Sequence, residues 1–141
     1  MALPIRSLRT ASATGKWRWM QWTVQALLAA FFLLAGYGHA TMPIAELAKS
    51  APWAADIPVA LMRFIGIAEM TGALGLVLPA ATRIAPSLMW VAAVGLCLIM
   101  LLAVLFHMWR REPFIIQVVI AAVAAFVAWR RFTWHRRGAS T

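Results

Sequence analysis

The stretch FIGIAEMTGALGLVLP, residues 64–79, decides the fold because it is apolar enough to cross a bilayer and yet contains Glu69 in its middle. A carboxylate at the centre of a membrane helix costs about 2.5–3.5 kcal/mol on insertion scales. Gly66, Gly72 and Gly75 lie near it at intervals of three residues, and small residues let a second helix approach closely. We therefore expect a tightly packed helix whose carboxylate points into a bundle and is protonated or bound to a partner.

The composition places most of the chain in a membrane. The 141 residues are 64% hydrophobic and 12% charged, whereas a soluble domain is about 45–50% apolar and about 25% charged. So short a soluble chain could not bury this much apolar surface in one core. The single cysteine, Cys97, excludes an intramolecular disulfide and a CxxC redox pair. One integral membrane domain is the simplest organisation.

Four apolar segments are long enough to span the roughly 30 Å hydrocarbon core as helices. They cover about residues 22–38, 59–78, 84–108 and 113–129. Glycines at 36 and 38 are expected to end the first helix, and Pro79 is expected to stop the second. Most tryptophans fall at the boundaries, Trp53 among them, as expected for a headgroup-depth residue. The predicted fold class is an all-α, integral membrane four-helix bundle.

The charges predict its orientation. Four crossings put both termini on one side, and both terminal segments, 1–20 and 132–141, are basic, so both are expected in the cytoplasm. Arg110 and Arg111, in the turn on the opposite side, count against this orientation, but the basic residues near the two termini outnumber them. Basic residues that flank apolar segments are a topology signal, so the net charge of +9 does not predict nucleic-acid binding.

The topology gathers several polar residues in the outer half of the bundle. The candidate polar pocket consists of Arg63, Glu69, His107 and Glu112, with His39 and Gln117 as weaker candidates. Such a pocket would suit a small amphiphile such as a quinone headgroup. The competing interpretation is an ion-pair network that only fixes the helix packing. For Gln117, as for Gln25, an interhelical hydrogen bond is a sufficient explanation.

A metal or haem site is not expected. His39 and His107 would both end helices on the same side, which is the arrangement that a b-type haem could use. However, the sequence contains no HExxH or CxxCH motif and no cluster with the spacing of metal ligands.

Three stretches resemble the DoxX-like family of small membrane proteins over roughly residues 20–131. They are LLAAFFLLAGYGHA (27–40), LMRFIGIAEMTGALGLVLPAATRIAPSL (61–88) and MLLAVLFHMWRREP (100–113). The most specific features are the series Arg63, Gly66, Glu69, Gly72, Gly75, then Leu78-Pro79, Arg83, Pro86 and the ending from His107 to Glu112. Where the family usually has a lysine after the glycine of the first helix, this chain has His39.

The resemblance implies a multi-pass protein of the bacterial-type cytoplasmic (inner) membrane, associated with redox systems, and it does not supply a substrate. The leading hypothesis is a quinone-binding component or a membrane anchor for a redox partner protein. The alternatives are a small proton-coupled transporter, for which a homodimer is expected, and a structural scaffold. No complete catalytic constellation is present, so a stand-alone enzyme is not expected.

Overall fold

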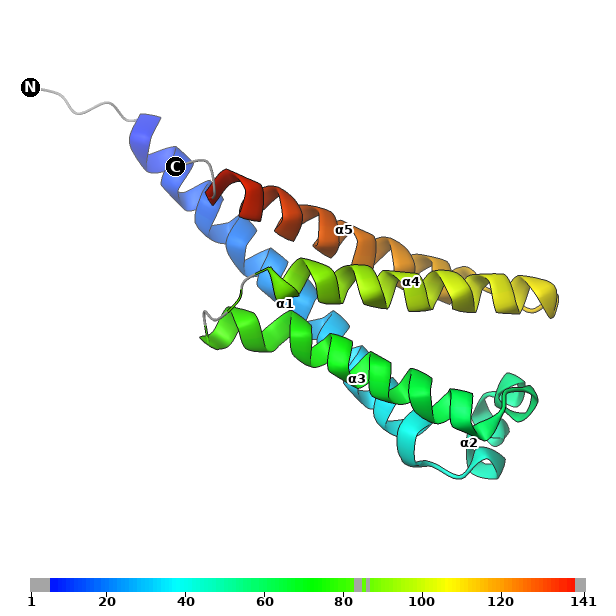
Figure 1. The fold of residues 1–141 in the computed structure, drawn as a ribbon. Helices are drawn as coiled ribbons and strands as arrows, with labels where there is room; N and C mark the ends of the chain where they lie inside the picture. Colours follow the sequence, from blue (N-terminus) through cyan, green and yellow to red (C-terminus); the bar gives the residue numbers. More distant parts are fainter. Residues whose placement is uncertain (1–5, 83–84, 86, 139–141) are drawn as a thin grey trace, which may run out of the picture.

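The computed structural model describes residues 6–82, 85 and 87–138, and this part of the chain is helical without strands (Figure 1). The elements are α1 (Arg6–Thr41), α2 (Ile44–Ser50), the 3-10 helix η1 (Pro52–Asp56), α3 (Val59–Thr82), α4 (Leu88–Trp109) and α5 (Ile115–Gly138). Four segments are long and apolar enough to cross a membrane: Trp19–Thr41, Val59–Pro79, Leu88–Trp109 and Ile115–Thr133. The predicted all-α membrane bundle with four spans is confirmed.

The bundle has two chemically different ends. At one end, which we call the terminal end, α1 begins, α5 finishes and α3 is followed by α4 (Figure 1). At the other, the histidine end, lie α2, η1, the turn between α4 and α5, and both His39 and His107. Which side of the membrane each end faces stays a prediction.

Several helix boundaries differ from the predicted ones. The first helix does not end at the glycines but continues to Thr41, because Gly36 is buried against α3. Pro79 does not stop the second helix, which continues to Thr82. A proline removes one backbone hydrogen bond, and close to a helix end this loss is tolerated. The third predicted helix includes residues 84 and 86, which lie outside the described residues; α4 itself begins at Leu88.

Helical backbone also reaches into both segments predicted as basic tails. α1 begins at Arg6, within segment 1–20, and α5 runs past the predicted end at residue 129 to Gly138. Both additions carry polar and basic residues, so the transmembrane part of each helix is shorter than the helix itself.

The segment between the first two spans folds into a small cap. α2 and η1 bury Leu47 and Ala54 against Met62 of α3, with Trp53 packed beside them. We use the name cap for residues 44–56. These short helices were not among the predicted elements, since neither is long enough to give a clear periodic pattern. Their apolar side chains nevertheless fasten the cap onto the start of α3.

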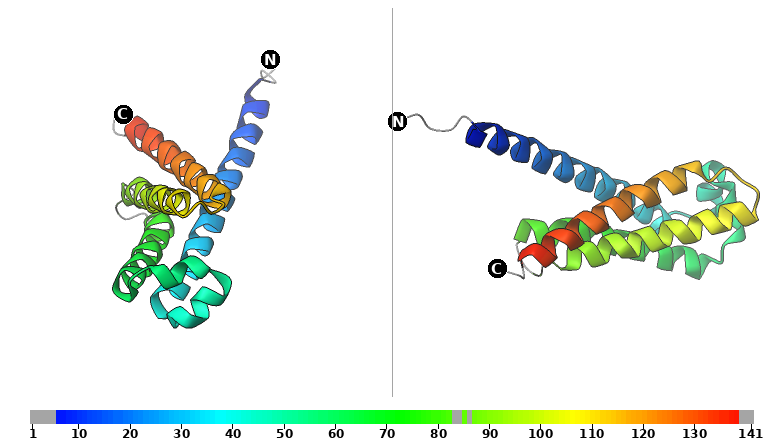
Figure 2. Two further views of the ribbon diagram at one scale, coloured as in Figure 1. Left: turned by 90° about the vertical axis from the view of Figure 1, so that its right-hand side faces the viewer. Right: turned by 90° about the horizontal axis from the view of Figure 1, so that it is seen from above.

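Two helix pairs form the bundle core. α1 contacts mainly α3, α4 contacts mainly α5, and α3 joins the two pairs through α4. Phe32, Leu76, Leu96 and Ala124 are buried where the helices meet. Large apolar side chains such as Leu34, Leu105 and Ile116 are exposed on the outer surface, as expected for a protein whose solvent is lipid. Figure 2 shows α1 and α5 separating toward the terminal end.

Candidate functional site

A close crossing of α1 and α3 places a histidine beside the membrane carboxylate. A Cβ atom built on Gly66 would lie 2.6 Å from the carbonyl oxygen of Gly36 and 2.5 Å from the backbone nitrogen of Ala40, so only glycine permits this approach. Glu69 lies one turn further along α3. His39 Nδ1 is therefore 2.6 Å from Glu69 Oε2, and the side chains are 16% and 3% exposed, respectively.

Arg63 contacts the same histidine through its backbone. One guanidinium nitrogen of Arg63 donates a hydrogen bond of 2.8 Å to the carbonyl oxygen of His39. That carbonyl lies in the last turn of α1, where carbonyl groups lack partners within the helix and the helix dipole favours a positive charge. Arg63 thus holds the end of α1 in place, and the residue that pairs with the Glu69 carboxylate is His39.

A second histidine–carboxylate pair lies in the turn between α4 and α5. His107 Nδ1 is 2.9 Å from Glu112 Oε2, and Arg110 Nε donates a 2.9 Å hydrogen bond to Glu112 Oε1. Arg110 also pairs with Asp56 at the end of the cap. Arg111 turns the chain with a left-handed φ of 57°. The hydrogen bond from Arg110 is the main cause that holds the pKa of Glu112 below its usual value.

Trp53 of the cap lies between the two pairs. Its ring centroid is 5.7 Å from that of His39 and 5.7 Å from that of His107, with both contacts edge-to-face. We call the five residues His39, Glu69, Trp53, His107 and Glu112 the histidine–tryptophan cluster. The cluster joins α1 and α3 to α4 and α5 through a ring that belongs to neither pair of helices.

The remaining predicted residues lie outside this cluster. Gln117 is the third residue of α5, and its buried Oε1 atom has no hydrogen-bond partner among the described residues. Gly72 and Gly75 face α4: a Cβ atom on either would approach Leu96 to 2.7 Å and Ala92 to 2.8 Å, respectively. The predicted residues thus include two hydrogen-bonded groups at the histidine end and two glycines at the contact between α3 and α4.

Sequence reasoning did not place three residues of this network: Trp53, Arg110 and Asp56. Trp53 is predicted as an interfacial residue, and Arg110 enters only as a charge in the orientation argument. Their contacts depend on the cap, whose fold is not evident in the sequence. The usable signal is that Asp56 and Glu112 are two of only four acidic residues in the chain.

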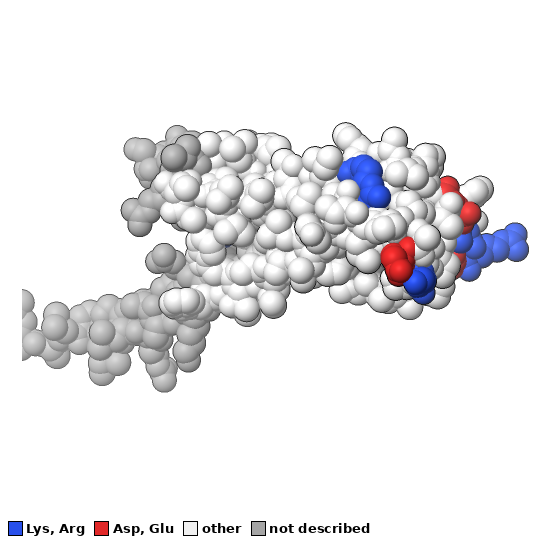
Figure 3. Space-filling view, turned by 90° about the horizontal axis from the view of Figure 1, so that it is seen from below, with Lys and Arg blue, Asp and Glu red and all other residues white. Residues whose placement is uncertain are grey.

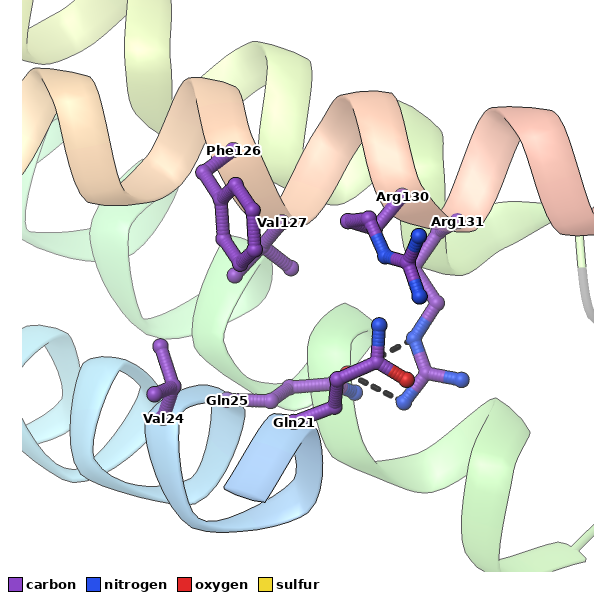
Figure 4. A pocket seen from close by; sticks show the side chains of 7 residues that line it. All are labelled: Gln21, Val24, Gln25, Phe126, Val127, Arg130 and Arg131. Carbon is purple, nitrogen blue, oxygen red and sulfur yellow. Dashed lines mark hydrogen bonds between the residues drawn. The ribbon is translucent and has the colours of Figure 1, made fainter. Parts of the chain in front are cut away.

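The bundle also has a polar junction at the terminal end (Figure 4). Buried Gln25 of α1 donates a hydrogen bond from Nε2 to the carbonyl oxygen of Leu76 in α3, and its Oε1 accepts bonds of 2.8 Å and 2.5 Å from Arg131 of α5. Arg131 also lies over the Trp22 ring, 5.3 Å from its centroid. Gln25 thus makes interhelical hydrogen bonds that connect three of the four spanning helices.

No residue of the histidine–tryptophan cluster lines either of two hollows that lie between α1 and α5. One, of about 10 Å³, lies beside Gln25 and Arg131; the other, of about 320 Å³, is an apolar groove between α1 and α5. Within the part of the chain that the structure describes, no three His, Cys, Asp or Glu side chains are grouped closely enough to hold a metal ion.

The fold and the two polar ends define a class of protein: a small multi-pass membrane protein with four spanning helices, a histidine–carboxylate network at one end and basic residues at the other. The sequence model of one family, described as the DoxX-like family, matches residues 23–130, and the chain belongs to this family. The resemblance noted from the sequence is thereby confirmed. Comparisons with curated proteins and with solved structures gave no match.

Proposed function

We propose that the histidine end binds the headgroup of a membrane quinone and exchanges protons with it, as one component of a redox system. The observation that supports this most directly is that two histidine–carboxylate pairs flank a single flat ring, with 5.7 Å from the Trp53 centroid to each histidine centroid. A quinone headgroup is also a flat ring, with oxygen atoms at opposite edges that accept hydrogen bonds. The spacing of the two imidazoles therefore suits such a ring, which would take the place of Trp53 when the cap shifts.

The histidines are the proposed proton-exchange groups. In each pair the carboxylate engages Nδ1, so Nε2 is the ring nitrogen that can give or take a proton. Glu69 and Glu112 stabilise the protonated imidazole in this scheme. A bound quinone takes up two electrons and two protons to become the quinol, with a partner redox protein supplying the electrons. The chain itself contributes binding, orientation and proton exchange.

The test is retention of decylubiquinone by the full-length protein reconstituted in lipid nanodiscs. We expect Glu69→Gln to lower the retained quinone by about tenfold, the effect of losing one hydrogen bond to a charged group, because the carboxylate no longer stabilises the protonated His39. The matched control is Glu46→Gln, which neutralises an exposed carboxylate of the same end that pairs with Lys49 at 2.7 Å. The control should retain quinone like the parent protein.

Thermal unfolding of each variant separates binding from folding. A parent protein that retains no quinone, or a folded Glu69→Gln variant that retains as much as the parent, would contradict the proposal. A variant that only unfolds at a lower temperature, in a protein without quinone, would favour the scaffold hypothesis for this network.

Proton-coupled transport is the second candidate, and the depth of Glu69 favours it. Its side chain is 3% exposed near the middle of the Val59–Pro79 span, and His39 connects it toward the histidine end. A buried carboxylate that alternates between protonated and ionised forms is a common element of such transporters. Solute flux in proteoliposomes that depends on a pH gradient and disappears in Glu69→Gln would support transport over quinone binding.

A further inference from the structure

The charge of the chain is divided between the two ends. All four acidic residues are distant from the terminal end: Glu46, Asp56 and Glu112 lie at the histidine end, and Glu69 lies within α3. On the face drawn in Figure 3, the coloured charged side chains gather at the histidine end, and the surface along the helices is uncharged. Arg130 and Arg131 therefore lie in a region whose charged side chains are all positive.

The two hollows of the bundle follow one another along the gap between α1 and α5. The small one is lined by Gln21 and Gln25 of α1 and by Arg130 and Arg131 of α5, and it lies nearer the terminal end. The larger one lies further into the bundle and is lined only by apolar side chains, Leu27 and Val119 among others. Val24 lines both, so a polar head region continues directly into an apolar groove.

The polar side chains of the head region suit an anion. With the Gln21 amide oriented so that its oxygen faces Arg130, that oxygen accepts hydrogen bonds of 2.6 Å and 2.9 Å from the guanidinium. Gln25 holds the neighbouring Arg131 through Nε and one terminal nitrogen. Two guanidinium groups, each held by a glutamine oxygen, are thus fixed at the mouth of the groove (Figure 4), and guanidinium is the side-chain group best suited to phosphate recognition.

We propose that the gap between α1 and α5 is a binding site for one anionic phospholipid. The phosphate lies at Gln21 and Arg130, and one acyl chain occupies the apolar groove beyond Val24. Charge complementarity selects a negative headgroup, and the wholly apolar lining of the groove below it selects a lipid over a free phosphate ion. The site is at the opposite end from the histidine–tryptophan cluster, so this proposal does not depend on the proposed quinone function.

The test is native mass spectrometry of the full-length protein with dioleoylphosphatidylglycerol, and with dioleoylphosphatidylcholine as the zwitterionic comparison. We expect one tightly retained phosphatidylglycerol per chain. Arg130→Gln should weaken its binding by about fivefold, the effect of one basic residue near an anionic surface. Arg111→Gln, which removes an exposed arginine at the histidine end, is the charge control and should bind like the parent.

A second pair of variants tests the groove without touching the arginines. Val119→Trp would fill the groove and should abolish lipid retention, whereas Val118→Trp, at a neighbouring exposed position that does not line it, should not. Equal retention by the parent, Arg130→Gln and Val119→Trp would overturn the proposal. So would protection from thermal unfolding by inorganic phosphate alone, or a lipid-free dimer that Val119→Trp disrupts, which would assign the groove to a second copy of the chain.

Discussion

Gly66 sets the distance between α1 and α3, and with it the position of His39 beside Glu69. An added methyl group would meet backbone atoms of Gly36, His39 and Ala40 at 2.5–2.9 Å, and backbone cannot move aside as a flexible side chain can. We expect Gly66→Ala to destabilise the protein by about 1–3 kcal/mol. Thermal unfolding in detergent measures this loss.

The matched control for that substitution is Gly95→Ala in α4. A Cβ atom at Gly95 has no neighbour within 4 Å, and alanine favours a helix over glycine by up to about 1 kcal/mol. Gly95→Ala should therefore be neutral or stabilising. If both glycine variants unfold at the same temperature as the parent, the crossing is looser than these contacts imply.

At the level of single residues, the sequence predicts the burial of Glu69 but not the residue that pairs with it. Midspan position and flanking glycines are enough to predict a buried carboxylate, because the bilayer penalises any other arrangement. The partner His39 depends on where the first helix ends. From the local sequence alone, a glycine predicts the end of a helix. Here Gly36 instead lies inside α1, where it contacts α3. Tertiary packing, which the sequence does not display, decides between the two.

The turn between α4 and α5 is expected to loosen in acid. Because the hydrogen bond from Arg110 lowers the pKa of Glu112 below 4.5, ionised Glu112 stabilises the folded state above that pH. The stabilisation is lost as the pH falls through the lowered pKa. Glu112→Gln should thus unfold at a lower temperature than the parent at about pH 7, and this difference should shrink as the pH falls below 4.5 and through the lowered pKa.

The comparison that isolates this effect is again Glu46→Gln, whose exposed carboxylate lies in α2. The difference in unfolding temperature between Glu46→Gln and the parent should change little over the same pH range. A Glu112→Gln variant whose difference from the parent persists unchanged in acid would show that the carboxylate charge is not what holds the turn.

At the level of elements, the spans are predictable and the connections are not. Apolar runs of about 20 residues have few alternatives in a bilayer, so all four are found near their predicted positions. The cap escapes prediction because α2 and η1 have only 7 and 5 residues, too few for a periodic pattern. Trp53 reaches the histidines only through that cap, and the centre of the candidate site is therefore invisible to sequence analysis.

The whole molecule is expected to insert with its terminal end in the cytoplasm, because basic residues near membrane spans are retained there. In a Cys97→Ala background, a membrane-impermeant maleimide should label Glu46→Cys in intact cells and Ser140→Cys only after the membrane is opened. The Cys97→Ala protein without an added cysteine is the control for background labelling. The reverse pattern of labelling would contradict the predicted orientation.

The uneven charge also restricts how two copies could associate. Eight of the 13 basic residues lie within residues 6–18 and 130–137 of the sequence: Arg6, Arg9, Lys16, Arg18, Arg130, Arg131, Arg136 and Arg137. In the rest of the chain the acidic and basic residues nearly balance, so the histidine end is close to neutral. A chain with this charge asymmetry is expected to insert in one direction rather than in either. A homodimer of such chains is therefore expected to be parallel, with its two-fold axis along the membrane normal and both histidine ends in the same compartment.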